Sequence, residues 1–470
     1  MRRLIGLSLF LLLTAAPAVT AAPDHPVVIA QGASGSLELV GHSPLNNRGM
    51  NAALAIKGDY AYVGSRTDAK ANNANGAGVL IVDIKDPSAP EVVGEIGPPD
   101  EANPGETSRE MRIWPEQNLL IVMTLFSNCG EIHACSPIEG QDRFNFYDIS
   151  GKNAAAPKLV STYEPSNDPH EFFLWDDPKR PGRALMYLST PSGAEKIVVT
   201  DISGARKGKF TELVKMSPLY TGSFVHSLAL NNAGTRGYIA HLTGGVGVLD
   251  TSDLAKGVKK PAIRVLTPPN NAPRWEGPGP HTAMKLFGSE TMLITDEVYG
   301  TAMRALGGHG CPWGWARFVD IKNPVKPKVI SEFKLPQNDE SYCSQDAAHP
   351  TTSFAAHNPT ITKNLAIITW HSGGLQVVDI SNPAKPSQAA EFLADPVIPI
   401  LQEDPVLSSG GDKVVAWSYP IVKDGLIYFV DVRNGLYVMR YKGPFATEIS
   451  KSKFLEGNSN LGDALRFEPV

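Results

Sequence analysis

The sequence predicts an all-β fold, a seven-bladed β-propeller whose ring is closed by a strand from near the N-terminus. Three observations lead to this prediction. Gly and Pro are abundant, at 43 and 38 of 470 residues, and long amphipathic helical patterns are missing, which is typical of short strands joined by turns. A strand–Asp–turn–strand motif recurs along the chain. One further strand-like segment, SLELVGH at 36–42, precedes the first copy of the motif.

Each copy of the motif is a β-rich run that ends in Asp, followed by a polar turn that usually carries Pro and by a second β run. VLIVDIKDPSAPEVVGEI at 79–96 and LQVVDISNPAKPSQAAEF at 375–392 are two clear copies. The repeated aspartates are Asp83, Asp148, Asp201, Asp250, Asp320 and Asp379, and a seventh copy carries Arg440 instead. Repeated units of four strands each are typical of propeller blades, and loop insertions lengthen some of the units. The Asp and Pro residues are expected to shape turns.

The two ends of the predicted ring complete each other. The seventh copy has no outer strand after residues 435–444, and residues 36–42 supply a spare strand. Pairing them would bury both sheet edges. We therefore expect a propeller over residues 36–443, preceded by a signal peptide at 1–21 and followed by a polar, peripheral tail at 444–470.

The segment Val-Val-Asp-Ile-Ser-Asn-Pro at 377–383 and its copies resemble the repeats of LVIVD-repeat propeller proteins. This resemblance covers about residues 36–443 and implies the fold, but propellers serve many unrelated functions. The chain is also similar, in architecture and in its richness in histidine, to selenium-binding proteins, which include methanethiol oxidases that hold copper through histidines. It lacks the paired His-His and the CxxC-type segment of that family, so this resemblance favours copper and oxidation without implying individual ligands.

The N-terminus predicts export. Arg2 and Arg3 precede an apolar run at 4–13 and a small-residue cleavage site at 19–21, which is typical of a cleaved signal peptide and of a periplasmic or secreted protein. The apolar run is too short to span a bilayer, and no later segment approaches a membrane span. Removing both arginines takes the formal net charge from −5 to −7, which gives no basic field for nucleic acid.

Four cysteines in an exported chain are expected to be oxidised. Cys129 with Cys135, and Cys311 with Cys343, are the pairings we favour, although four cysteines allow three connectivities. The long connections, at 65–78, 127–141, 297–314, 337–356 and about 393–414, are all predicted to lie on one face of the ring. Long loops on a rigid scaffold usually carry binding, so a small-molecule substrate, and a protein partner as an alternative, are expected on that face.

Histidines begin the innermost strands of four consecutive predicted blades, where they would surround the central channel at one depth. They are His170, His226, His281 and His357, and they are the predicted metal ligands. Neutral imidazole suits copper, zinc and iron, and copper is placed first with zinc or iron next. Two further histidines, His241 and His371, end second strands on the same face and are predicted to lie one strand further out, near the metal or the substrate.

Charged residues at the same predicted mouth are candidates for contacting a polar or anionic substrate. They are Glu297, Arg109, Glu110 and Arg433. Glu171 follows His170 directly, so in a regular strand its side chain would point the other way. Trp417 and Tyr419 are candidates for an apolar wall.

Three interpretations of the histidines stay open. They ligate a metal in an enzyme, such as an oxidoreductase; they act without metal as acid and base in a lyase or hydrolase; or they are framework residues of a propeller that binds protein or glycan. A framework role predicts one histidine in most blades, whereas here they cluster in four neighbours. No CxxC zinc pair, HExxH, GxSxG or Walker loop is present in the sequence, and no nucleotide cofactor is expected.

Overall fold

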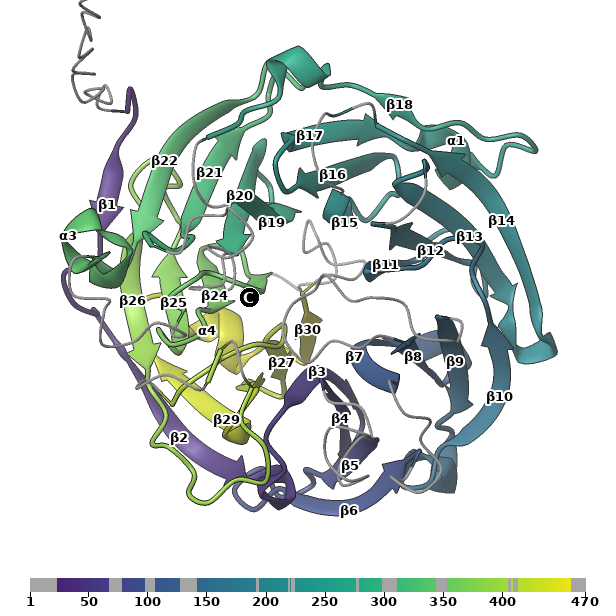
Figure 1. Cartoon of the computed structure of the whole chain (residues 1–470), viewed down its shortest axis with the longest axis horizontal. Helices are drawn as coiled ribbons and strands as arrows, with labels where there is room; N and C mark the ends of the chain where they lie inside the picture. Colours follow the sequence, from purple (N-terminus) through teal and green to yellow (C-terminus); the bar gives the residue numbers. More distant parts are fainter. Residues whose placement is uncertain are drawn as a thin grey trace, which may run out of the picture.

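Seven β-sheets stand around a central axis in the computed structural model of the chain (Figure 1). The structure describes residues 23–66, 78–97, 106–126, 142–191, 194–218, 220, 225–275, 279–297, 311–343, 353–404, 407–408 and 413–457. The predicted signal peptide at 1–21 and most of the predicted long loops, including 127–141, lie outside these residues. None of the helices in the described part of the chain is long and apolar enough to cross a membrane.

The first six blades follow one another along the chain, each running from an inner to an outer strand. Blade one consists of β3 (Asn51–Lys57), β4 (Tyr60–Ser65), β5 (Val79–Asp83) and β6 (Glu91–Ile96). Blade two consists of β7 (Glu106–Trp114), β8 (Leu119–Phe126), β9 (Arg143–Asp148) and β10 (Lys158–Tyr163). Blades three and four are β11 (Glu171–Asp176), β12 (Ala184–Ser189), β13 (Ile197–Gly204), β14 (Lys209–Met216), and β15 (Val225–Leu230), β16 (Arg236–His241), β17 (Gly245–Asp250), β18 (Arg264–Val265). Blades five and six are β19 (Gly279–Lys285), β20 (Thr291–Glu297), β21 (Ala316–Asp320), β22 (Lys328–Lys334), and β23 (Pro359–Ile361), β24 (Leu365–Thr369), β25 (Leu375–Asp379), β26 (Ser387–Phe392).

The seventh blade confirms the predicted closure of the ring. It contains β27 (Ile421–Lys423), β28 (Leu426–Asp431) and β29 (Gly435–Lys442), and its outer strand is the N-terminal β2 (Ser36–Ser43), which pairs antiparallel with β29. A strand that was not predicted, β1 (Val27–Ile29), adds in parallel to the outer edge of β22. Joining both ends of the chain in one sheet covers edges that would otherwise be open to pairing with other chains.

The expectation of a peripheral C-terminal tail is wrong for the residues that the structure describes. After α4 (Ala446–Ser450), the strand β30 (Phe454–Glu456) pairs antiparallel with β27, on the side nearest the axis (Figure 1). Leu455 and Glu456 are buried there. The innermost strand of blade seven is only three residues long and has an unpaired edge, and the returning tail satisfies that edge.

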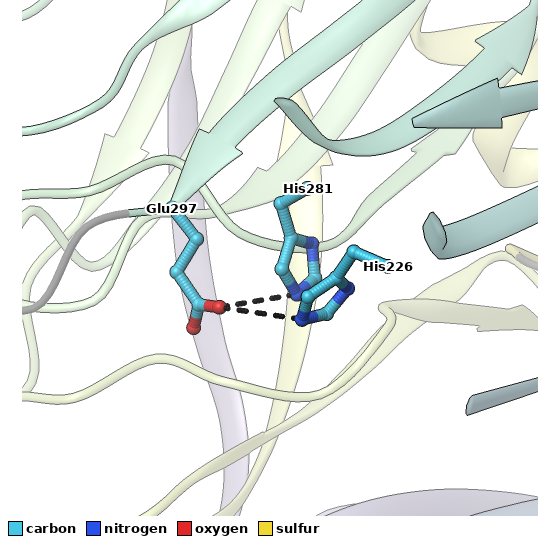
Figure 2. Close-up of side chains that lie close together, drawn as sticks. All are labelled: His226, His281 and Glu297. Carbon is cyan, nitrogen blue, oxygen red and sulfur yellow. Dashed lines mark ion pairs between the residues drawn. The ribbon is translucent and has the colours of Figure 1, made fainter. Parts of the chain in front are cut away.

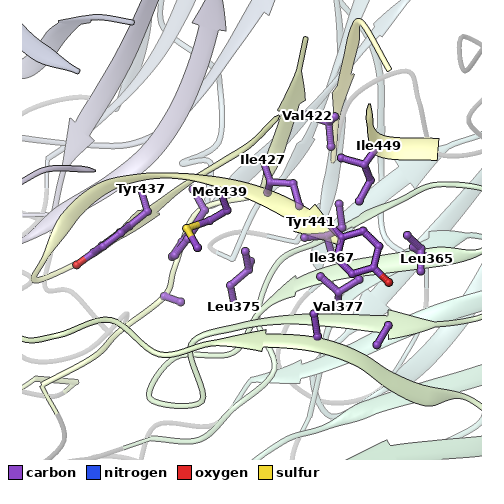
Figure 3. Close-up of a cluster of buried hydrophobic side chains, with 14 of the residues drawn as sticks. Leu365, Ile367, Leu375, Val377, Val422, Ile427, Tyr437, Met439, Tyr441 and Ile449 are labelled. Carbon is purple, nitrogen blue, oxygen red and sulfur yellow. The ribbon is translucent and has the colours of Figure 1, made fainter. Parts of the chain in front are cut away.

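Apolar side chains fill the space between neighbouring blades. Between blades six and seven, Ile367 and Leu375 pack against Ile427 and Met439, and Ile449 of the tail joins the same cluster (Figure 3). Successive side chains of a strand point to opposite faces of its sheet, so each blade presents apolar residues to both neighbours. This stacking makes the ring a rigid scaffold for whatever lies at its axis.

The repeated aspartates have the structural role that the sequence predicts. The carboxylate of Asp83 accepts the backbone N–H of Lys85 at 2.8 Å, and that of Asp379 accepts the N–H of Ser381 at 2.9 Å. The same bond to the residue two positions on occurs at Asp201, Asp250 and Asp320. These bonds close the turns after the third strands, so the repeat motif specifies the fold rather than the site.

Cysteine pairing remains largely a prediction. Cys311 is disulfide-bonded, and the described residues include no free cysteine. The side chains of Cys129, Cys135 and Cys343 lie outside the described part of the chain, so the two predicted pairings are not tested.

Candidate metal centre

His226 and His281, two of the predicted ligands, lie at bulges in innermost strands. The register of β15 against β16 shifts between Val225 and Ser227, and that of β19 against β20 shifts between Pro280 and Thr282. The extra residues are His226 and His281. A bulge lets the extra residue leave the strict alternation of the ladder, and bulges of this kind are common beside functional sites. Both imidazoles thereby reach the axis together.

Glu297 is the centre of the cluster. It ends β20, and its Oε2 lies 3.2 Å from His281 Nε2 and 3.9 Å from His226 Nε2 (Figure 2). Its other oxygen, Oε1, lies 3.0 Å from His357 Nε2 and 3.4 Å from His371 Nε2. Four imidazole nitrogens from three blades therefore surround one carboxylate. The sequence placed Glu297 among substrate contacts, whereas the structure places it among the predicted ligands.

The opposite ring nitrogens of the four histidines each face a neighbouring oxygen. His357 Nδ1 lies 2.6 Å from the Trp417 carbonyl oxygen, His371 Nδ1 lies 3.1 Å from Ser353 Oγ, and His281 Nδ1 lies 2.8 Å from Thr282 Oγ1. His226 Nδ1 lies 3.6 Å from Glu171 Oε2. Anchoring one ring nitrogen so that the other faces an ion is the usual arrangement of metal-binding histidines.

The charges in the cluster are those that a cation would require. Burial lowers the pKa of His226 and of His371 to about 4, and it lowers the pKa of His281 well below its ordinary value. Burial alone would raise the pKa of Glu297, but the neighbouring His281 and His357 hold that pKa well below its ordinary value. Near neutral pH the imidazoles of His226, His281 and His371 are thus neutral, and the carboxylate of Glu297 is ionised.

The distances around Glu297 also fit a cation. A backbone carbonyl can only accept, so the short contact to Trp417 places a proton on His357 Nδ1. His357 Nε2 then faces the buried Oε1 of Glu297 at 3.0 Å. Two ligands bonded at about 2.1 Å to one ion lie roughly 3.0–3.4 Å apart for bond angles of about 90–109°. Three of the four distances around Glu297 are within that range.

The described residues contain two groups of ligand atoms close enough to hold an ion, and both include Glu297. One group is His226, His281 and Glu297; the other is Glu297, His357 and His371. The structure therefore does not bring the four predicted histidines into one set. His371, which was predicted to lie further out, belongs to the second group, and its backbone is left-handed there, with φ of 35°.

His170, the fourth predicted ligand, lies next to these groups without belonging to either. Its Nε2 is 2.8 Å from His226 Nε2. The next residue corrects a prediction: Glu171 does not point away from the site, since its Oε2 approaches His226 and its Oε1 accepts a hydrogen bond from Tyr419 at 2.9 Å. His170 precedes β11 rather than lying in it, so strand alternation does not govern the pair.

A small cavity of about 30 Å³ adjoins the cluster. Its lining includes Arg109, Glu110 and Trp417 beside the histidines. A cavity of this size holds one or two water-sized molecules. Trp417 forms the wall predicted for it: its ring lies 4.0 Å from that of His357 and 5.4 Å from that of His371, between centroids.

Two predicted site residues lie elsewhere. His241 accepts the backbone N–H of Gly244 at 3.1 Å and packs beside Tyr220, so it serves the end of its own blade. Arg433 is held by Glu403 at 3.0 Å and by the Val397 carbonyl oxygen at 2.7 Å. His241 ends the second strand β16 as predicted, whereas Arg433 lies two residues beyond the end of β28, and local partners hold both side chains.

A buried set of charged and polar side chains adjoins the cavity, and two of its members, Arg112 and Glu456, were not predicted. Glu110 pairs with Arg112 at 3.2 Å, and Arg112 lies over the Tyr419 ring at 5.1 Å. Burial raises the pKa of Glu110, Glu171 and Glu456 to about 7 each, although Arg112 opposes the shift in all three. No sequence pattern could show that Glu456, in the tail, returns to this interior.

The comparisons with known proteins concern the fold. The family model described as "LVIVD repeat" matches residues 48–96 and 360–393. No curated protein matches the chain. Two solved structures of Sqt1 from Chaetomium thermophilum are similar at 12% identity with a TM-score of 0.46. One, bound to the N-terminus of ribosomal protein L10, covers 85% of this chain and 89% of its own; the other covers 84% and 86%. Together, the matched residues and the seven blades show that the chain is a seven-bladed β-propeller that contains LVIVD repeats.

Proposed function

We propose that this propeller is a metal-dependent enzyme whose centre is the cluster around Glu297. The observation that carries the proposal is the carboxylate of Glu297, with imidazole nitrogens of His281, His357 and His371 at 3.0–3.4 Å. At these distances the nitrogens and the carboxylate oxygens are placed as ligands that share an ion. A divalent cation in either of the two groups would be held by two imidazoles and the carboxylate.

The carboxylate changes the order of metals that we propose. Histidines alone favoured copper, and the resemblance to selenium-binding proteins supported that choice. Two histidines with one carboxylate are the ligand set of non-haem iron(II) oxygenases and of several catalytic zinc sites. We therefore place iron(II) and zinc ahead of copper, and we propose oxidation of a small molecule as the reaction class that this set fits best.

The protein's own residues would bind and orient the substrate. Arg109 lines the cavity beside the histidines, where a guanidinium suits a small anionic or polar group. Glu171, with its pKa raised to about 7 by burial, is poised to give or accept a proton, and the Tyr419 hydroxyl orients it. Trp417 shields one side from water. A bound ion would supply Lewis acidity or a redox centre.

Export remains part of the proposal. The disulfide-bonded Cys311 and the N-terminal 21 residues support a periplasmic or secreted location. An exported enzyme would meet its metal outside the cytoplasm, so purified protein can lack the physiological ion and must be tested after reloading.

The test is metal analysis of untagged protein after supplementation with iron(II), zinc and copper(II) in turn. We expect at least one equivalent of a transition metal per chain, and loss of most of it in Glu297→Gln. His241→Ala is the matched control, because that histidine is also buried but lies outside the cluster. Folded protein that retains less than about 0.2 equivalents of every metal would favour metal-free acid–base chemistry instead.

A further inference from the structure

The two oxygens of Glu297 serve different pairs of histidines. Oε2 faces His281 and His226, at 3.2 and 3.9 Å, while Oε1 faces His357 and His371, at 3.0 and 3.4 Å. The first pair comes from the innermost strands of blades four and five, and the second pair comes from blade six. The carboxylate therefore stands between two separate ligand sets.

One ion cannot collect all four imidazoles in this arrangement. Within each set of three, the ligand atoms lie within 4.8 Å of one another, and no larger set of described residues meets that limit. Two ligands bonded at about 2.1 Å to the same ion can be at most roughly 4.2 Å apart. A single ion would therefore occupy one set and leave the other set's nitrogens facing the carboxylate.

The second set is held as firmly as the first. His357 Nδ1 is fixed by the Trp417 carbonyl, and His371 Nδ1 by Ser353. His371 also adopts a left-handed backbone conformation, with φ of 35°, that non-glycine residues rarely adopt. Backbone hydrogen bonds of 3.1 Å in both directions tie it to Ala416. Strain that the surroundings maintain in this way is concentrated at functional positions.

We propose that the centre binds two divalent metal ions, one in each set, with the Glu297 carboxylate bridging them. This inference rests on the proposed function and sharpens it, because paired ions about 3.5–4 Å apart act jointly on one small ligand. The cavity that Arg109 lines lies beside both sets and would admit such a ligand.

The test is the metal content of the full-length protein after loading with Zn²⁺ and removal of excess. The wild-type chain should hold two equivalents. His281→Ala removes a ligand from the first set only and should hold one. His371→Asn changes the second set, keeps a residue that tolerates the left-handed conformation, and should also hold one. Should it fail to fold, His357→Ala tests the same set, and His241→Ala should keep two equivalents.

Copper(II) supplies an independent readout of the distance between the ions. Two copper(II) ions about 3.5–4 Å apart couple magnetically, so the wild-type protein should show a broadened EPR signal and a half-field line. His281→Ala and His371→Asn should each show the full signal of one isolated ion. One equivalent in the wild-type chain, or two in a single-set variant, would overturn the two-ion inference and leave the proposed function standing. Retention of no metal would overturn both.

Discussion

Glu456 allows a direct test of whether the C-terminal tail belongs to the interior of the ring. Its side chain lies on β30, is buried, and has its pKa raised to about 7 by burial. An ordinary glutamate has a pKa near 4.5. Between these values the folded chain binds a proton that the unfolded chain has released, so the free energy of unfolding falls as pH rises through this window.

The size of the effect follows from the two pKa values. The complete shift corresponds to about 3.4 kcal/mol, since one pKa unit is about 1.36 kcal/mol. Titrating a group from a pKa of 4.5 to one of about 7 places about 2.5 kcal/mol of that loss between pH 5 and pH 8. Glu456→Gln cannot ionise, so its stability relative to the wild-type chain should increase by about 2.5 kcal/mol over the same interval.

The assay is urea unfolding of both proteins at pH 5, 6.5 and 8 at constant ionic strength. Glu91→Gln, which changes an exposed glutamate on β6, is the control and should show no such trend. Taking the difference between variant and wild type removes the contribution of titrating groups that do not interact with Glu456. A relative change below about 0.5 kcal/mol would show that Glu456 titrates as it does in water and that the tail does not occupy the ring's interior.

Four further predictions concern the site, the tail and export. The double variant His226→Ala/His357→Ala should bind no zinc by metal analysis and keep its β-sheet circular dichroism; retained zinc would contradict the ligand sets. Because burial lowers the pKa of His226 and His371 to about 4, zinc affinity measured by competition should change less than about threefold between pH 6 and pH 8, whereas imidazoles with a pKa of about 6.5 would lose more than tenfold. Leu455→Ala should lower the unfolding free energy by about 2–5 kcal/mol in urea titrations, and a loss under 0.5 kcal/mol would refute its burial. N-terminal sequencing of exported protein should begin near Ala22, and an intact Met1 would refute cleavage.

The repeat made the fold predictable from the sequence. The strand that each repeat Asp ends, and the turn that its carboxylate closes, recur with local signals that need no knowledge of distant residues. Closure by residues 36–43 was equally accessible, because a sheet that lacks an outer strand and a spare strand elsewhere imply each other. The pairing of β30 with β27 could not be predicted from the sequence, since three residues in a polar tail carry no periodicity that identifies a partner.

The site was predictable in part, and for the same reason. Counting along the blades located His226, His281 and His357, because equivalent positions in neighbouring blades must approach the axis at one depth. That counting assumes regular strands. His226 and His281 are the extra residues of bulges, and His371 lies in a left-handed turn, so local departures from regularity decided which side chains meet.

The role of Glu297 becomes clear only when the sequence and the structure are considered together. In the sequence, Glu297 was one of several carboxylates near the predicted mouth of the channel, and it was predicted only to contact a substrate. In the structure its two oxygens divide four imidazoles into two pairs, and this division is a property of the blades, not of the residue. The blades that carry the repeat thereby bring together ligands that no single blade could supply, and this division of the imidazoles is the premise of the two-ion proposal.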